Sequence, residues 1–373
     1  MFSLKSNDVR ARVFPVAVCA SAILVGTSAA AETRGYVVSW FHTATYVSPD
    51  NCPNGENPGT FDYREQNLMK LGYTKEQALA LMTSPKSEDE EKMTELLVYR
   101  GMRNGKPANV YNFPTSVPDP HINTVTGKFM YGFNLNGRVE PGSFEDPETH
   151  EQGVDNQLWR AVGCFKDYEL SLPNRPFFEQ VMWDAMIDTM PAWSIMISGQ
   201  DLSKDGPVTV TFDKTLKHLR RGAGGNVMSD ATFPTDPSGR SHNVFRGQIK
   251  DHVLSIEPGH LLLEGESPTF TEVNLASTHL RLHLDPNGDL EGYIGGYQPW
   301  LDFYFVYASH GRDCDTPDIP GLYYALRRLA DADPDPATGQ NRSISATYRL
   351  EAVPAFLLRP DGQVLATPDG QVQ

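Results

Sequence analysis

Residues 275–297 read LASTHLRLHLDPNGDLEGYIGGY and carry the clearest β-hairpin pattern in the chain. On both sides of a Pro-Asn-Gly turn signal, apolar residues alternate with other residues at the period of two expected of a half-buried strand. A two-residue Asn-Gly turn would place Leu284 opposite Glu291, an apolar residue and a charge on one face of the sheet. A three-residue loop with Gly288 in the left-handed conformation places Leu284 opposite Leu290 instead. The sequence therefore predicts a hairpin with one apolar and one polar face.

The polar face of this hairpin collects five side chains: His279, Arg281, His283, Glu291 and Tyr293. In the predicted register His283 faces Glu291, and Arg281 faces Tyr293. His279 and His283 lie roughly 13 Å apart along a strand, too far apart to bind one metal ion directly. A half-exposed polar surface without a ligand would give the same pattern. We take these five residues as the candidate binding site.

Five further short segments are rich in alternating apolar residues and are separated by Gly, Pro, Asp and Ser: residues 193–197, 208–212, 245–249, 253–256 and 260–264. Residues 36–41 have the composition of another strand. Short strands between turn-forming residues are typical of an antiparallel sandwich or jelly roll. The predicted fold class is α+β, with an antiparallel β-sandwich or jelly-roll-like core and helical N-terminal and C-terminal additions.

The sequence also predicts several helices. Three of them begin with a capping side chain that a Glu or Gln follows three residues later. These pairs are Asp62 with Glu65, Thr74 with Gln77, and Ser87 with Glu90. Apolar stripes predict further helices over residues 177–190 and 321–331. Residues 299–310 combine aromatic strand formers with helix-boundary residues, and we favour a helix. The polar tail beyond Pro360 is predicted to be disordered.

Residues 1–31 have the pattern of a secretory signal peptide, with a basic start, an apolar run at 13–25 and small residues at 28–31. The run is too short to span a bilayer, and no later stretch approaches a span. We expect a secreted or periplasmic protein. The net charge of −15 would become −17 without these residues, which carry three basic groups and one aspartate. That charge disfavours nucleic acid as a partner.

The predicted organisation has four parts. They are a signal peptide at 1–31, a helical and loop region at 32–150, a β-sandwich domain at 151–310, and a C-terminal helix and tail at 311–373.

Three cysteines follow the predicted signal peptide, and an oxidising compartment favours their pairing. Cys52 lies in a loop rich in Pro, Gly and Asn that needs a tether, and Cys164 ends an apolar stretch. Cys314 lies between two aspartates, whose charges disfavour its thiolate. We therefore predict a disulfide between Cys52 and Cys164.

The densest run of oxygen ligands lies at residues 145–156. Calcium prefers several carboxylate and amide oxygens from one flexible loop, and the candidate ligands are Glu148, Glu151, Asp155 and Asn156. The run lacks the spacing of an EF-hand loop, so a solvated acidic loop is the alternative that we favour. Calcium is the one cofactor that the residues indicate.

Motifs with fixed catalytic spacing were not found. The chain has no G-x-S-x-G, no H-E-x-x-H and no C-x-x-C, which disfavours a serine hydrolase, a zincin and thioredoxin-like redox chemistry. A glycosidase needs two carboxylates facing across a sugar, and Glu291 is a candidate for one of them. The glycine-rich residues 222–225 follow a basic segment, and we interpret them as a flexible connection.

Three pieces resemble a loosely defined set of uncharacterised secreted bacterial proteins that carry a GVDN or GIDN element before a β-rich region. They are GVDNQLWRAVGC at 153–164, Ile-Ser-Gly at 197–199, and LEGYIGGY at 290–297. The resemblance covers about half of the chain. It implies a secreted location and a β-rich architecture, and it implies no catalytic residue.

A well-patterned scaffold without catalytic motifs predicts a secreted, non-catalytic binding or interaction protein whose ligand the sequence does not identify. Its partner would be another envelope protein or a glycan. The alternatives are a carbohydrate-active hydrolase that uses loop carboxylates, and a calcium-stabilised envelope protein.

Overall fold

A computed structural model describes residues 31–168, 170–171, 175–176, 180, 183–185, 187–236, 239–267, 270–285, 288–310 and 318–371. The predicted signal peptide and Cys314 lie outside these residues.

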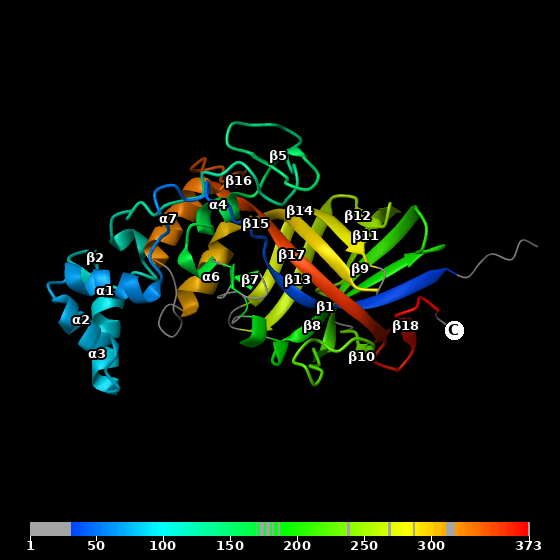
Figure 1. Ribbon diagram of the computed structural model, residues 1–373, viewed down its shortest axis with the longest axis horizontal. Helices are drawn as coiled ribbons and strands as arrows, with labels where there is room; N and C mark the ends of the chain where they lie inside the picture. Colours follow the sequence, from blue (N-terminus) through cyan, green and yellow to red (C-terminus); the bar gives the residue numbers. More distant parts are fainter. Residues whose placement is uncertain are drawn as a thin grey trace, which may run out of the picture. The chain divides into compact units, whose positions relative to one another are not determined.

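Eight strands form a closed antiparallel barrel (Figure 1). In ring order they are β1 (Glu32–Thr43), β8 (Pro191–Gly199), β9 (Gly206–His218), β11 (Asn243–Lys250), β12 (Val253–Ile256), β14 (Phe270–Leu284), β15 (Leu290–Pro299) and β17 (Asn341–Leu358). The ring closes because β17 pairs with β15 on one side and with β1 on the other. The predicted sandwich or jelly-roll core with helical additions is therefore wrong. Alternation shows that one face of a strand is buried, and both a barrel and a sandwich satisfy it.

The barrel interior is a packed apolar core. Paired strands place Ile195 opposite Phe212, Leu254 opposite Leu282, and Ile294 opposite Tyr348, and all of these side chains are buried. Side chains fill an eight-stranded barrel in this way. At Gly292 a Cβ atom would lie 2.1 Å from the carbonyl oxygen of Arg281, so the close approach of the backbones requires glycine.

The predicted hairpin is formed by β14 and β15 in the predicted register. Leu284 faces Leu290, His283 faces Glu291, and Arg281 faces Tyr293. Gly288 has a φ of +95°, as the three-residue loop requires, while the other two loop residues lie outside the described part of the chain. The strands predicted around it are also present.

Four further strands extend the sheet. β13 (Gly259–Ser267) pairs with β14, and β10 (Ala231–Pro234), β16 (Ala332–Pro334) and β18 (Val364–Ala366) pair with β17. The backbone N–H of Gly35 also donates to the carbonyl oxygen of Thr367 over 3.1 Å. The prediction of a disordered tail is therefore wrong, because β1 and β17 supply its backbone partners. The described residues also form three short two-stranded sheets. They pair β2 (Gly101–Arg103) with β3 (Lys106–Ala108), β4 (Phe144–Glu145) with β5 (Gln152–Val154), and β6 (Leu170–Ser171) with β7 (Arg175–Pro176).

The first three helices are α1 (Thr60–Lys70), α2 (Lys75–Met82) and α3 (Ser87–Val98). They share a small hydrophobic core of their own, made of Leu68, Ala78, Leu81, Met93 and Leu97. The predicted capping box of Thr74 and Gln77 is formed. The other two predicted caps are wrong, because Gly59 is the N-cap residue of α1 and Lys86 that of α3.

The later helices are α4 (Gln157–Val162), α6 (Trp300–His310) and α7 (Ile319–Leu329), with two short 3₁₀ helices, η1 (Pro114–Ser116) and η2 (Lys166–Tyr168). The helices predicted over 299–310 and 321–331 are thus confirmed within two residues. The helix predicted over 177–190 falls partly outside the described residues. Within that range the described residues 180, 183–185 and 187 are helical. Among the described residues, no helix is both long and apolar enough to cross a membrane.

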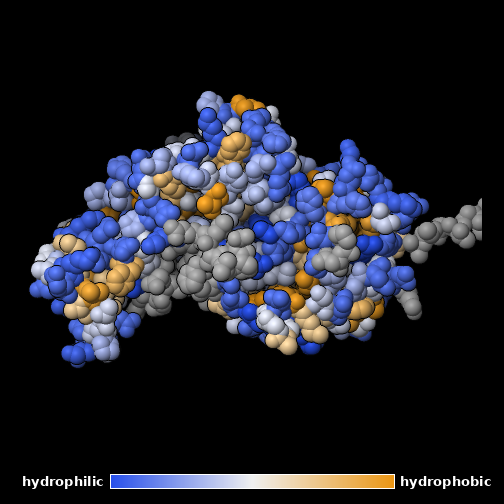
Figure 2. All heavy atoms as spheres, in the orientation of Figure 1, coloured by the Kyte–Doolittle hydropathy of each residue, from blue (hydrophilic) through white to orange (hydrophobic). Residues whose placement is uncertain are grey.

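The predicted disulfide between Cys52 and Cys164 is present, with the two Cα atoms 5.7 Å apart. It joins Cys52, in the loop after β1, to Cys164, two residues after the end of α4. The visible surface of the molecule is mainly hydrophilic, with small scattered hydrophobic patches (Figure 2).

Candidate functional site

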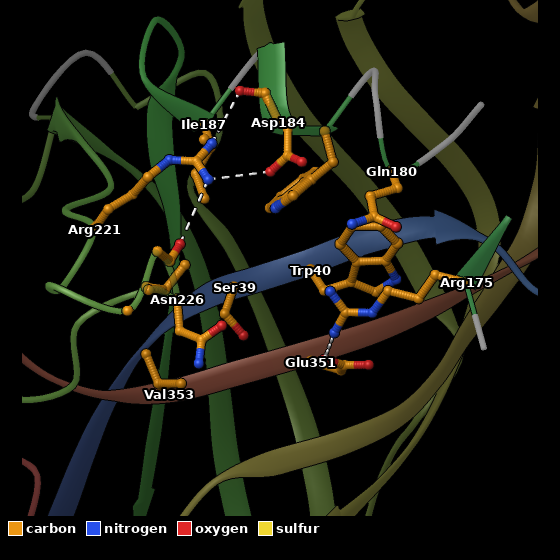
Figure 3. A pocket seen from close by; sticks show the side chains of 14 residues that line it. Ser39, Trp40, Arg175, Gln180, Asp184, Ile187, Arg221, Asn226, Glu351 and Val353 are labelled. Carbon is orange, nitrogen blue, oxygen red and sulfur yellow. Dashed lines mark hydrogen bonds and ion pairs between the residues drawn. The ribbon is translucent and has the colours of Figure 1, made fainter. Parts of the chain in front are cut away.

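A cleft of about 510 Å³ lies against the outer side of β1 and β17 (Figure 3). We call it the Trp40 cleft. Its lining residues are Ser39, Trp40, Arg175, Gln180, Trp183, Asp184, Ile187, Arg221, Gly224, Gly225, Asn226, Val227, Glu351 and Val353. They come from β1, β7, β17, the helical residues 180, 183, 184 and 187, and the turn at residues 221–227.

One wall of the cleft is built by the register between β1 and β17. A bulge between Val38 and Trp40 shifts the pairing so that Trp40 lies opposite Glu351. Arg175 of β7 then lies over the Trp40 ring, with its guanidinium carbon 3.9 Å from the ring centroid. Its Nη2 atom is 2.6 Å from a carboxylate oxygen of Glu351. Arg175 therefore makes a cation–π contact and an ion pair at once.

The opposite wall is an ordered turn. The backbone N–H of Gly222 donates to the carbonyl oxygen of Asn226 over 2.8 Å, and a bridge joins Arg221 to Val227. The Arg221 guanidinium lies 3.1 Å from Asp184 and 3.2 Å from Asp188. Burial acts against the charged form of Arg221, but hydrogen bonds to these carboxylates outweigh it and raise its pKa. The glycine-rich segment, predicted as a flexible connection, thus forms a fastened wall of the cleft.

Two indole groups on the cleft lining are buried, and they have no hydrogen-bond acceptor in the described part of the chain. Trp40 is 1% exposed and Trp183 is 4% exposed, and their rings meet edge to face at 5.9 Å. Neither Nε1 atom has an acceptor among the described residues. By contrast, Trp193 and Trp300 donate to the carbonyl oxygens of Glu264 and Asn341. An unpaired buried donor costs about 1–3 kcal/mol.

Trp159 also has a buried Nε1 atom without an acceptor among the described residues, but it does not line the cleft. An unpaired indole N–H is therefore not by itself a sign of a ligand in this chain. The distinguishing feature of the Trp40 cleft is that two such indole groups, those of Trp40 and Trp183, line the same cleft.

The predicted polar face of the hairpin continues from the cleft through β17. Arg349 Nε lies 3.0 Å from Glu351, and the same guanidinium forms an ion pair with Glu291. The strand register places Arg349 opposite Tyr293. The alternation along β14 and β15 predicts part of this surface, whereas the cleft beside it depends on pairings between residues that are distant in sequence.

The five predicted binding residues have different surroundings. Arg281 is largely buried and forms a 2.6 Å ion pair with Asp146, so it fastens the loop that joins β4 and β5. Tyr293 stacks on Tyr131 with 4.7 Å between ring centroids, and burial raises its pKa. His279 Nδ1 lies 2.9 Å from the carbonyl oxygen of Ser277.

The other two predicted binding residues, His283 and Glu291, are exposed and face each other across β14 and β15. The structure therefore places all five residues on one side of the hairpin and leaves these two most accessible. Whether they bind a ligand stays a prediction.

The four candidate calcium ligands are divided between surface and interior. Glu148 and Glu151 are exposed, whereas Asp155 and Asn156 are buried. One Asp155 oxygen accepts hydrogen bonds from the backbone N–H groups of Leu135 and Asn136. The Asn156 side-chain oxygen caps α4 by accepting a hydrogen bond from the backbone N–H of Trp159. In the described part of the chain, no group of three or more His, Cys, Asp or Glu side chains is placed to hold a metal ion. Calcium binding stays a prediction.

The GVDN element has a structural role at each position. Gly153 has a φ of +83°, and a Cβ atom there would lie 2.3 Å from the carbonyl oxygen of Arg138. Val154 is buried in the main core. Asp155 and Asn156 hold the neighbouring loop and the start of α4. The element therefore holds β5, the loop at residues 134–138 and the start of α4 together.

The sequence patterns do not mark Trp40, Arg175, Asp184, Arg221 or Glu351 as residues of one site. Trp40 lay in a predicted strand, but no local pattern connects it with residues more than a hundred positions away. Comparison of the chain with protein-family models, with curated proteins and with solved structures gave no match.

Proposed function

We propose that this protein binds a neutral, hydroxyl-rich ligand, a saccharide, in the Trp40 cleft and does not transform it. The observation that carries the proposal is the pair of buried indole N–H groups without described acceptors on the lining of a polar cleft. Saccharide hydroxyls accept hydrogen bonds from such donors.

The charges of the cleft favour a neutral ligand. Arg175 is paired with Glu351, and Arg221 with Asp184, so each arginine has a carboxylate beside it. A charged ligand would have to compete with one of these pairs. Gln180 and Asn226 also line the cleft, and their amides both donate and accept hydrogen bonds, as sugar hydroxyls do.

Both indole nitrogens lie beneath the cleft surface, so direct contact with a ligand requires a side-chain shift. Such rotamer changes are common when a preformed site is occupied. A saccharide that turns the Trp40 indole towards the cleft would relieve its unpaired donor. The hydrogen bond gained by the Trp40 N–H would lower the free energy of the bound state relative to the free state.

A glycan array of neutral oligosaccharides, followed by calorimetry with the strongest binder, tests the proposal. Trp40→Phe keeps an aromatic ring and removes the N–H donor, and we expect it to weaken binding roughly five- to tenfold. Trp159→Phe removes an unpaired indole N–H away from the cleft and is the matched control, with affinity unchanged. Absence of binding to every neutral glycan, or equal affinity of wild type and Trp40→Phe, would overturn the proposal.

A hydrolase is the second candidate, because the cleft contains two carboxylates, Asp184 and Glu351. Glycosidases use a pair of carboxylates, one of which donates a proton to the leaving group. Each carboxylate here is engaged by an arginine, which favours binding over proton donation. Chromatography of oligosaccharides incubated with wild type and with Glu351→Gln decides between the two. Products that appear with wild type and vanish with the variant would establish the hydrolase.

A secreted or periplasmic location accompanies this proposal and stays a prediction from the pattern of residues 1–31. Calcium stabilisation likewise stays a prediction, and thermal unfolding with and without a chelator tests it.

A further inference from the structure

The outer face of the barrel beside the cleft carries a straight row of side chains. Register places Trp40 opposite Glu351, Glu351 opposite Glu291, and Glu291 opposite His283. Neighbouring strands are about 4.8 Å apart, so this row over β1, β17, β15 and β14 spans about 14 Å. The span exceeds the length of one sugar ring.

An aromatic series begins beside the same row at Tyr293, which lies two positions after Glu291 on β15. Tyr293 stacks on Tyr131, whose ring meets Tyr46 at 5.8 Å, and Tyr46 meets Phe129 at 6.3 Å. Phe129 is 39% exposed at the end of this series. Aromatic rings with one apolar face and a polar edge suit contact with sugars.

The charges along the row are balanced, as they are in the cleft. Arg349 is placed between Glu351 and Glu291, and it forms ion pairs with both. Side chains of Glu291 and Arg349 are 50% and 34% exposed, so their remaining hydrogen-bonding positions face solvent. A neutral chain of sugars could meet them without displacing a buried charge.

We propose that the ligand is an oligosaccharide of several residues, which begins in the Trp40 cleft and runs over β17, β15 and β14 to His283, with the aromatic series from Tyr293 to Phe129 along its side. This inference rests on the proposed saccharide-binding function and specifies the class of saccharide. The cleft holds one end, and the row and its aromatic border hold the following sugars.

Calorimetry with the strongest neutral glycan from the array and its truncations, down to the single sugar, tests the inference. Affinity should rise with chain length until the row is filled. His283→Ala and Phe129→Ala should each weaken binding of the longest glycan roughly fivefold and leave the single sugar unaffected. Trp40→Phe should weaken both.

Two matched controls separate this surface from general effects of truncation. The exposed fraction of Phe113 is 38%, similar to the 39% of Phe129, and His121 is an exposed histidine on another loop. Phe113→Ala and His121→Ala should change neither affinity. Affinity that does not rise with chain length, or a rise that both row variants leave intact, overturns the extended site while the proposed function stands. If no neutral glycan binds, the proposed function fails and this inference fails with it.

Discussion

Arg281 of β14 donates to Asp146 across 2.6 Å, and the Asp146 side chain has no exposed surface. Burial opposes ionisation of this carboxyl, but the backbone N–H of Thr149 and the Arg281 guanidinium outweigh it and lower the pKa of Asp146. The ion pair fastens the loop between β4 and β5 to the barrel. The candidate surface beside Tyr131 and Tyr293 depends on that loop.

Asp146→Asn should lower the free energy of unfolding by about 3 kcal/mol, because it leaves the Arg281 charge buried without its partner. Urea unfolding followed by circular dichroism measures the change. The exposed pair of Asp333 and Arg342 provides the control, and Asp333→Asn should cost less than about 0.5 kcal/mol. Equal effects of the two substitutions would contradict the assigned role of Asp146.

Asp155 should make stability depend on pH. Burial raises its pKa to about 6, and Asp331 adds to the effect. In the unfolded chain this carboxyl ionises near pH 4. Ionised Asp155 therefore destabilises the fold above about pH 6 by roughly 3 kcal/mol, and the cost disappears as pH falls towards 4.

Asp155→Asn removes this titration. Its stability relative to wild type should be higher at pH 7 than at pH 4.5 by about 2 kcal/mol. Urea unfolding of Asp155→Asn and of wild type at both pH values measures the difference. A difference between Asp155→Asn and wild type that does not change with pH would rule out a raised pKa.

The disulfide should stabilise the fold strongly, because Cys52 and Cys164 are separated by 112 positions. Closing a loop of that length lowers the entropy of the unfolded chain by an amount worth about 5 kcal/mol. Cys52→Ser/Cys164→Ser should therefore unfold at a markedly lower temperature than wild type. A reducing agent should lower the unfolding temperature of wild type and leave that of the double variant unchanged.

The Thr74 cap should have a local effect. Thr74→Ala removes the capping box of α2 and should cost about 1 kcal/mol. Since α1, α2 and α3 have a core separate from that of the barrel, amide hydrogen exchange should accelerate in these helices. Thr74→Ser, which keeps the hydroxyl, is the control. Faster exchange in β14 and β15 would show that the two cores unfold together.

The hairpin could be predicted because its information is local. Turn length, alternation and the conflict between Leu284 and Glu291 select one register without any distant residue. The Cys52–Cys164 pairing was likewise open to prediction, since few cysteines were available.

Barrel closure was not predicted, because it depends on β17. Residues 346–353 do alternate, with Ala346, Tyr348 and Leu350 facing inward and Thr347, Arg349 and Glu351 outward, so a strand signal was present. Its two partners, β1 and β15, are distant in sequence. The cleft depends on the same long-range pairing, which brings Trp40 to Glu351.

The central claim is that the Trp40 and Trp183 indole N–H groups receive a saccharide. The chain has five tryptophans, so a ¹H–¹⁵N correlation spectrum should resolve five indole signals. Titration with the strongest neutral glycan should shift the signals of Trp40 and Trp183 and slow their exchange with water, while Trp159, Trp193 and Trp300 stay in place. Binding that leaves the Trp40 and Trp183 signals unchanged would contradict the claim.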